Sequence, residues 1–133
     1  FAVLDIDDFK MVNDNFGHIG GDYVLKMLAM KLREEMGELA IIARYGGDEF
    51  MIMLSQISRT EADSRLSKLV QSMDTEVEYE GHVRKLSISV GAVYTTQMQD
   101  VDTLFKKADE VLYDVKEMGK NNYQLTCLDE MIL

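Results

Sequence analysis

Two acidic segments of the chain have residue types and spacing that could bind a metal ion. The first is Asp5, Asp7 and Asp8, which follow the apolar run at residues 1–4. Successive side chains of a strand point to opposite faces, so Asp5 and Asp7 share a face of the predicted strand. Carboxylates at the end of a buried strand, beside a backbone carbonyl, make a hard oxygen site that suits Mg²⁺. Asp5 is predicted to be a ligand; for Asp7 and Asp8, capping of the next helix or exposure to solvent is an equal alternative.

The second acidic segment is a glycine-rich turn, Arg44-Tyr45-Gly46-Gly47-Asp48-Glu49-Phe50. Two glycines without side-chain bulk let a ligand approach the backbone closely, and two acidic residues follow them. Taken alone, such a turn is most often a solvated hairpin. Together with Asp5 it predicts a phosphoryl-transfer centre, in which carboxylates hold metal ions against a phosphate and a nucleophile.

Hydrophobic periodicity predicts the elements that must position these segments. Helices are predicted at residues 9–16, around residues 25–36, at residues 59–73 and from residue 101 to Gly119, with a break at residues 17–21. Strands are predicted at residues 1–6, 40–43, 50–54, 77–79, from 83 through the alternating stretch 86–94, and 123–127. Gly46 and Gly47 are expected to adopt the positive φ angles of a tight hairpin turn. The mixture of hairpins and helical crossovers predicts an α+β fold with a mainly antiparallel sheet covered by helices.

Composition limits the class of protein. The chain has 133 residues, of which 47% are apolar, and a net charge of −10, so one domain over residues 1–133 is expected. The negative charge opposes contact with a nucleic-acid backbone or an anionic membrane. A single cysteine, Cys127, excludes a disulfide framework and a thiolate metal site. With no bilayer-length apolar stretch, a cytoplasmic location is expected for this domain, although the full-length protein could be membrane-anchored upstream.

Four separated motifs resemble those of the GGDEF family of diguanylate cyclases, which condense two GTP molecules into cyclic di-GMP and two pyrophosphates. Residues 44–50 match the family's signature residue for residue. The other motifs are Asp5-Ile6-Asp7-Asp8-Phe9-Lys10 with Val12-Asn13-Asp14, then Phe16-Gly17-His18 with Gly21-Asp22, and finally Ala108-Asp109, Leu112-Tyr113, Lys116 and Gly119-Lys120-Asn121. The resemblance runs to about residue 126. It implies a ferredoxin-like, five-stranded sheet related to polymerase palms and nucleotidyl cyclases, here truncated at its N-terminus because the family's opening helix is missing.

The resemblance also implies which residues bind metal and which carry catalysis. Asp5 and Asp48 would hold Mg²⁺ or Mn²⁺, with the carbonyl of Ile6 as a further ligand. Glu49 would be a second catalytic acid that binds another metal ion or assists deprotonation. His18 is expected to be structural, because the metal-dependent mechanism does not require it.

The remaining implied residues bind the nucleotide. A carboxylate that accepts from guanine N1 and N2 hydrogens discriminates against adenine, which would leave that carboxylate unpaired. The substrate-binding residues implied are Asn13 and Asp22 for the guanine edge, Lys10, Lys116 and Lys120 for the triphosphate, and Gly46 and Gly47 at the turn. The family often has arginine where Lys120 stands, and lysine offers a point charge rather than a two-pronged donor.

The function implied is a diguanylate cyclase, a nucleotidyltransferase of cyclic di-GMP signalling, that acts as a homodimer with one GTP in each subunit. The alternative is a catalytically silent GTP-binding module that regulates a neighbouring domain, although the intact signature favours the enzyme. A cyclase that accepts ATP is a third possibility, against which Asp22 argues. Many family members carry an Arg-x-x-Asp inhibitory site before the signature; here those positions hold Gly37 and Ala40, so product feedback at this site is expected to be absent.

Overall fold

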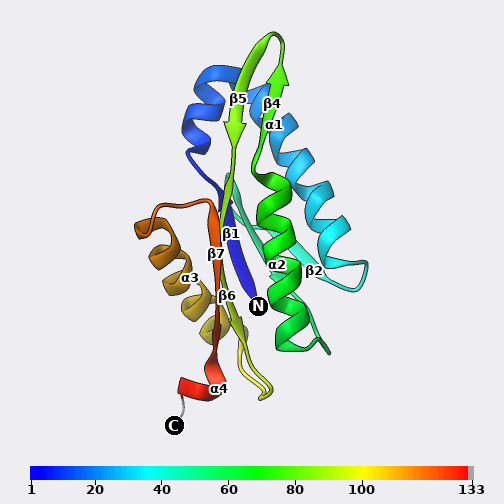
Figure 1. Ribbon diagram of the computed structural model, residues 1–133, viewed down its shortest axis with the longest axis vertical. Helices are drawn as coiled ribbons and strands as arrows, with labels where there is room; N and C mark the ends of the chain where they lie inside the picture. The colour runs from blue at the N-terminus through cyan, green and yellow to red at the C-terminus, as the bar shows by residue number, and fades with distance from the viewer. Residues whose placement is uncertain (132–133) are drawn as a thin grey trace.

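The computed structural model describes residues 1–131, and a five-stranded sheet lies at their centre (Figure 1). The strands of this sheet are β1 (Ala2–Ile6), β2 (Ile41–Arg44), β3 (Glu49–Met53), β6 (Ile88–Tyr94) and β7 (Asn122–Cys127). Their order is β2-β3-β1-β6-β7; β6 and β7 run parallel, and every other neighbouring pair is antiparallel. The predicted α+β fold with a mainly antiparallel, five-stranded sheet is therefore confirmed.

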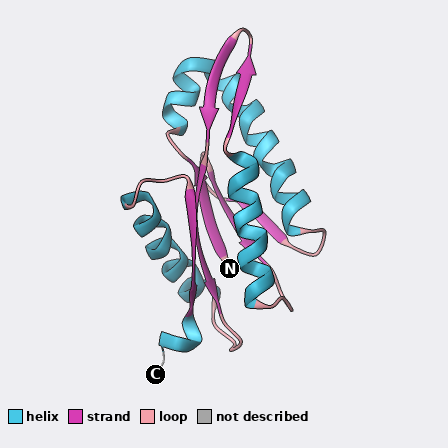
Figure 2. Ribbon diagram, in the orientation of Figure 1, coloured by secondary structure: helices cyan, strands magenta, loops and turns pink. Residues whose placement is uncertain are grey.

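Helices cover both faces of the sheet, and a separate hairpin extends beyond one end of it (Figure 2). The helices are α1 (Phe9–Met36), α2 (Arg59–Met73), α3 (Val101–Glu117) and the short α4 (Leu128–Met131). The hairpin consists of β4 (Thr75–Tyr79) and β5 (His82–Leu86). None of the helices within residues 1–131 is both long and apolar enough to cross a membrane.

Helix α1 is interrupted at one residue rather than over a glycine-rich loop. Gly17 has φ 74° and ψ 172°, which is outside the helical region, and the helix resumes at His18. Gly20 and Gly21 are helical and buried, so the prediction of a break over residues 17–21 is wrong beyond Gly17. A Cβ on Gly20 would lie 2.4 Å from the Cβ of Phe16. Glycine there permits close packing instead of ending the helix.

The hairpin of β2 and β3 forms as predicted, but its glycines act differently from the expectation. Neither Gly46 nor Gly47 has a positive φ angle. A Cβ on Gly46 would lie 2.5 Å from Oε2 of Glu49, so the missing side chain leaves room for that carboxylate. Positive φ angles occur instead at Glu80 and Gly81, in the turn between β4 and β5.

Strand β6 lies in the interior of the sheet, and six of its seven residues are buried. The predicted continuous strand from residue 83 is split, because Ser87 separates β5 from β6. The face opposite Ile88 and Val90 is covered by α3. A Cβ on Gly91 would lie 2.2 Å from the backbone nitrogen of Leu112, so this glycine lets α3 approach the sheet closely. The contact fixes the height of α3 above β1 and β6.

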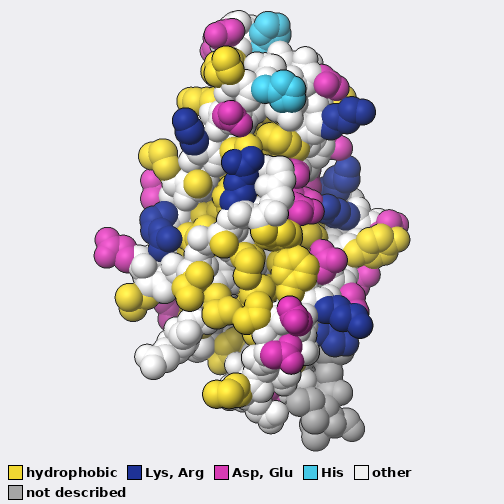
Figure 3. Space-filling model, turned by 180° about the vertical axis from the view of Figure 1, so that it is seen from behind, with side chains coloured by type: hydrophobic (Ala, Val, Ile, Leu, Met, Phe, Trp, Pro, Cys, Tyr) yellow, Lys and Arg dark blue, Asp and Glu magenta, His cyan; other side chains and the backbone are white. Residues whose placement is uncertain are grey.

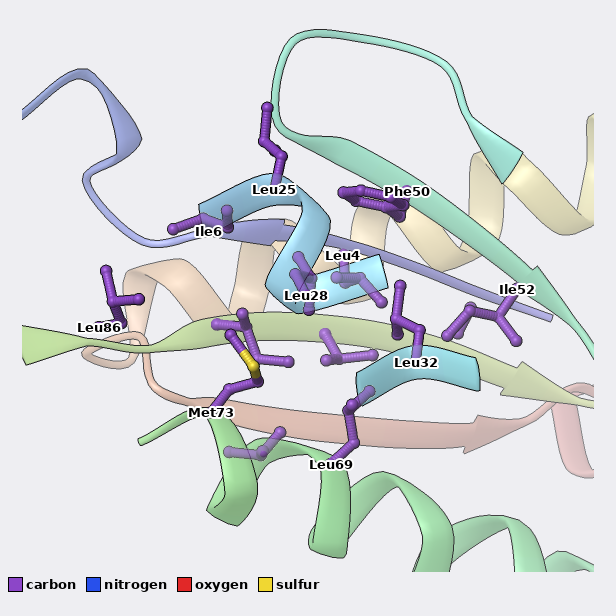
Figure 4. Close-up of a cluster of buried hydrophobic side chains, with 14 of the residues drawn as sticks. Leu4, Ile6, Leu25, Leu28, Leu32, Phe50, Ile52, Leu69, Met73 and Leu86 are labelled. Carbon is purple, nitrogen blue, oxygen red and sulfur yellow. The ribbon is translucent and has the colours of Figure 1, made fainter. Parts of the chain in front are cut away.

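The core has two layers, one on each face of the sheet. The larger layer lies between the sheet and helices α1 and α2, and Figure 4 shows Leu4, Leu28 and Leu69 directed into it. The smaller layer lies under α3 and includes Val3 and Val93. Seen from behind, further hydrophobic side chains gather over the middle and lower part of the surface (Figure 3). The two layers pack against opposite faces of β1 and so fix the position of its acidic end.

Candidate functional site

A depression of about 500 Å³ lies where β1 ends, beside the β2–β3 turn and the C-terminal end of α3. It brings together segments that are more than a hundred residues apart in the chain. Its lining residues are Asp5, Ile6, Asp7, Asp8, Phe9, Lys10, Asn13, Gly47, Asp48, Lys116 and Lys120. Eight residues implied by the resemblance thus line one depression: Asp5, Ile6, Lys10, Asn13, Gly47, Asp48, Lys116 and Lys120.

Asp5 is a buried carboxylate, with only 6% of the residue exposed. It lies opposite Glu49 of β3 and Ser89 of β6 in the sheet. Its Oδ2 accepts a hydrogen bond from Nζ of Lys116, whereas its buried Oδ1 has no hydrogen-bond partner within the described part of the chain. Burial raises the pKa of Asp5 to about 6, against the opposing effect of Lys116. An unpartnered buried carboxylate oxygen is costly, and a cation beside it would remove that cost.

Asp48 lies in the β2–β3 turn, half-buried at the edge of the same depression. Burial raises its pKa, while its own backbone N–H, Lys116 and Arg44 act in the opposite direction. Arg44 also holds the turn in shape, because its Nε donates to the carbonyl oxygens of Gly46 at 3.3 Å and Gly47 at 3.0 Å. Lys116 is therefore the cation that acts on both carboxylates.

Glu49 and Gly46 lie beside the depression rather than in its lining. The carboxylate of Glu49 packs against Gly46, and Glu49 is the direct cross-strand neighbour of Asp5. Glu49 also raises the pKa of Tyr45, although burial is the larger cause of that pKa of about 12. Glu49 thus lies next to the acidic wall of the depression, which is formed by Asp5 and Asp48.

The acidic wall fits a divalent cation that is held partly by substrate. No cluster of three or more His, Cys, Asp or Glu side chains suited to a metal ion occurs within residues 1–131. Mg²⁺, however, is usually bound by one or two carboxylates together with substrate phosphates, rather than by a complete protein cage. Asp5, with its free Oδ1, and Asp48 match that donor set, and Ile6 lines the same wall.

Two lysines, one at the end of α3 and one in the turn that follows it, lie opposite the acidic residues of the depression. Lys116 pairs with Asp5, and Nζ of Lys120 lies 2.9 Å from Oδ1 of Asp8. The hydrogen bond with Asp8 raises the pKa of Lys120. Lys10 is exposed and lines the depression from the first turn of α1. Three ammonium groups in one depression can bind an anion with several phosphates.

Asn13 and Asp22 occupy neighbouring depressions instead of one pocket. Asn13 lines the depression at β1, and a Cβ on Gly21 would lie 1.9 Å from its Oδ1, so the amide rests against the backbone one residue before Asp22. Asp22 is exposed and lines an adjoining depression between α1 and the β2–β3 hairpin, with Lys26 and Arg44. A ligand that contacts both residues must therefore extend across the two depressions.

A third cavity, of about 310 Å³, lies near the start of β1 at the other end of the sheet. Its lining includes Ala2, Leu66 and Tyr94 and no Asp, Glu, Lys or Arg side chain. It therefore lacks the charged groups that bind a polyphosphate or a metal ion.

Sequence reasoning missed the role of Asp7. The prediction that Asp7 or Asp8 caps α1 is wrong: Asp8 is at the cap position with φ 56°, and it makes no side-chain capping hydrogen bond. Asp7 is instead buried and accepts hydrogen bonds from Ser87, Ser89 and the backbone of Asn121. The signal in the sequence is the pair Ser87 and Ser89, just before and within β6, where apolar residues otherwise dominate.

The comparisons with known proteins agree with the fold and the motifs. Residues 1–122 match the family described as "Diguanylate cyclase, GGDEF domain". The diguanylate cyclase DgcP of Pseudomonas aeruginosa is 34% identical over 125 residues, which cover 93% of this chain and 19% of that protein. The cyclic di-GMP phosphodiesterase NbdA of the same organism is 32% identical over 122 residues, 91% of this chain and 16% of that protein. The chain thus spans less than a fifth of the length of these relatives.

Among solved structures, the diguanylate cyclase SiaD of Pseudomonas aeruginosa, in complex with its activator SiaC, superimposes with a TM-score of 0.85. It is 31% identical, and the match covers 93% of this chain and 48% of that one. The α+β fold of this chain is therefore the GGDEF fold. The family match extends over nearly the whole chain and includes the acidic end of β1, the Gly-Gly-Asp-Glu turn and all of α3. The chain therefore belongs to the GGDEF-domain family of diguanylate cyclases.

Proposed function

We propose that this domain is a working diguanylate cyclase, which condenses two GTP molecules into cyclic di-GMP and releases two pyrophosphates. The observation that carries the proposal is the acidic wall of Asp5 and Asp48, with an unpartnered buried oxygen on Asp5, beside Lys116 and Lys120. Such a wall combines what phosphoryl transfer requires: carboxylates for a metal ion and ammonium groups for phosphates. Glu49, which completes the signature, is the second acidic group.

Asp5 and Asp48 would hold Mg²⁺ or Mn²⁺, with the carbonyl oxygen of Ile6. When bound, the metal ion supplies Lewis acidity that lowers the pKa of the ribose 3′-hydroxyl and neutralises charge at the α-phosphate. Lys116, which now neutralises Asp5, is free to move its ammonium group to a phosphate oxygen once a cation takes its place. Glu49, next to Asp5 in the sheet, would bind a second ion or accept the 3′-hydroxyl proton.

The nucleotide would lie across the two adjoining depressions. Its phosphates would meet Lys10, Lys116 and Lys120 at the end of β1, and Gly46 and Gly47 would leave room for it above the turn. Its guanine edge would reach past Asn13 toward Asp22. An ionised Asp22 would accept from two guanine hydrogens that adenine does not offer in that geometry.

Two subunits are needed, because one subunit binds one GTP and the product contains two. In the proposed homodimer, the depressions of the two subunits face each other. The 3′-hydroxyl of each GTP then attacks the α-phosphate of the other in line, and pyrophosphate leaves.

The competing function is a GTP-binding module without turnover that regulates a neighbouring domain. The resemblance to a protein named as a cyclic di-GMP phosphodiesterase keeps this alternative in view. Asp48 and Glu49 favour the enzyme, because a module that only binds GTP does not need both acids. Incubation of the chain with GTP and Mg²⁺, followed by chromatography of the nucleotides, separates the two: the enzyme yields cyclic di-GMP, and the module returns GTP unchanged.

A further inference from the structure

Asp7 is buried, with 9% of the residue exposed, and its carboxylate accepts hydrogen bonds from three segments of the fold. Its Oδ1 accepts from the hydroxyl of Ser89 at 2.5 Å. Its Oδ2 accepts from the hydroxyl of Ser87 at 2.7 Å and from the backbone N–H of Asn121 at 3.0 Å. These donors belong to β6, to the junction between β5 and β6, and to the turn between α3 and β7. The carboxylate therefore ties the end of β1 to the turn that follows α3.

That turn has an unfavourable backbone conformation. Gly119, Lys120 and Asn121 have φ angles of 118°, 65° and 49°, all in the left-handed region that residues with a side chain rarely adopt. Such a conformation persists only where surrounding contacts enforce it. Within the chain, the N–H of Lys120 donates to the carbonyl of Val115 at 3.2 Å, and the N–H of Asn121 donates to Asp7. Asp7 accepts the backbone hydrogen bond that links the turn to the end of β1, and Asp8 binds the Lys120 side chain there.

We propose that Asp7 is a positioning residue that holds the α3–β7 turn so that Lys120 faces the phosphate site. The proposal rests on the proposed function for the identity of the ligand. An ionised carboxylate can accept all three hydrogen bonds, whereas the asparagine amide has one acceptor oxygen and would direct an NH₂ group toward a donor. Asp7 acts through the turn and has no direct role in the chemistry.

The proposal predicts that loss of the Asp7 charge weakens nucleotide binding, whereas electrostatics alone predicts that it strengthens binding. Removing a negative charge near a phosphate site should strengthen the binding of a polyanion. Asp8→Asn removes such a charge and releases Lys120 from its ion pair, so nucleotide binding should become tighter. Asp7→Asn also removes a charge, yet it should weaken binding, because the turn that carries Lys120 loses its anchor.

The test compares the binding of a non-hydrolysable GTP analogue, with Mg²⁺, to the full chain and its variants. Asp7→Asn should weaken binding about tenfold, the lower end of the loss seen when a group that orients a metal ligand is removed. If Asp7 acts through Lys120, the double variant Asp7→Asn/Lys120→Ala should bind about as weakly as Lys120→Ala alone. Unchanged or tighter binding by Asp7→Asn, or losses that multiply in the double variant, would overturn the proposal.

A second readout follows the turn itself and does not depend on nucleotide. Amide hydrogen exchange at Asn121 should be slow in the parent and fast in Asp7→Asn, with core amides of α3 unchanged. If Asp7→Asn does not fold, Ser87→Ala serves instead, because it removes only the hydroxyl that shares Oδ2 with Asn121; about a threefold weakening is then expected. If the parent binds no GTP analogue, the proposed function fails, and exchange at Asn121 alone supports or contradicts the anchor.

Discussion

At the scale of single residues, the depression at β1 holds a buried carboxylate, Asp5, that has a partner within residues 1–131 for only one of its two oxygens. Lys116 is hydrogen-bonded to Oδ2 of Asp5 and acts on Asp48 as well, while Oδ1 of Asp5 has no partner among the residues described. Burial is the leading cause of the raised pKa of both carboxyl groups. A buried acidic pair that shares one lysine is arranged to receive a further cation.

Asp48→Ala should reduce cyclic di-GMP synthesis to less than about a tenth of the parent rate, because it removes a proposed metal ligand. The fold should remain intact, since a half-exposed carboxylate in a turn contributes little to packing. Synthesis is measured by chromatography and folding by thermal denaturation. Asp114→Ala, an exposed carboxylate on α3, is the matched control and should keep its activity. Activity of Asp48→Ala near the parent level would remove Asp48 from the metal site.

Asp22→Ser should relax the choice of base more than it affects metal binding. Loss of a charged acceptor for two guanine hydrogens should reduce discrimination by on the order of 1.5–3 kcal/mol, which is about tenfold or more. Competition between GTP and ATP for the variant measures this directly. If the preference for GTP is as strong as in the parent, the depression around Asp22 is not the guanine site.

At the scale of elements, α3 carries Lys116, which lines the depression, and the position of α3 depends on Gly91. Gly91→Val should push α3 away from β6, because the new side chain would overlap the backbone of Leu112. Overpacking of this kind typically costs about 1–3 kcal/mol, and displacement of Lys116 should also weaken nucleotide binding. Denaturant unfolding and binding of a GTP analogue check the two effects. Parent-like stability would show that α3 tolerates a side chain at this contact.

Asp100, at the N-terminal cap of α3, should make the free energy of unfolding depend on pH. Asp100 caps the helix by accepting from the N–H of Thr103 at 2.7 Å, and this hydrogen bond is the main reason that its pKa is lowered. Because the folded-state pKa lies below the unfolded value, the ionised cap stabilises the protein at neutral pH, and this stabilisation is lost as pH falls through the folded-state pKa. Asp100→Ala should therefore lower Tm by a few degrees at pH 7, with a smaller difference near pH 2. Equal Tm differences at the two pH values would contradict the role of the charge.

Periodic elements were predictable from the sequence, whereas contacts between elements were not. The three- and four-residue spacing of Leu66, Leu69 and Met73 gave α2 with the bounds that the structure has. Gly91 is needed because α3 packs closely against β6 at this residue, and no local sequence pattern indicates that contact. The hydrogen bonds of Asp7 were missed for the same reason, because its partners lie 80 or more residues away.

At the scale of the whole molecule, the proposed reaction needs two copies of the chain. Its net charge of −10 opposes the close approach of two copies, so GTP and metal ions are expected to bridge them. The initial rate of synthesis should therefore rise more steeply than linearly with protein concentration below the dimerisation constant. Rates at a series of protein dilutions test this. A rate per subunit that is independent of dilution, for a protein shown to be monomeric, would contradict the two-subunit mechanism.

The most direct test of cyclase activity is the stoichiometry of the reaction. The chain is incubated with GTP and Mg²⁺ while cyclic di-GMP and pyrophosphate are measured in the same sample. The predicted result is one cyclic di-GMP and two pyrophosphates for every two GTP consumed, with both products absent when Mg²⁺ is chelated. GTP that binds to the folded chain and remains unconverted would contradict the account and favour the regulatory module.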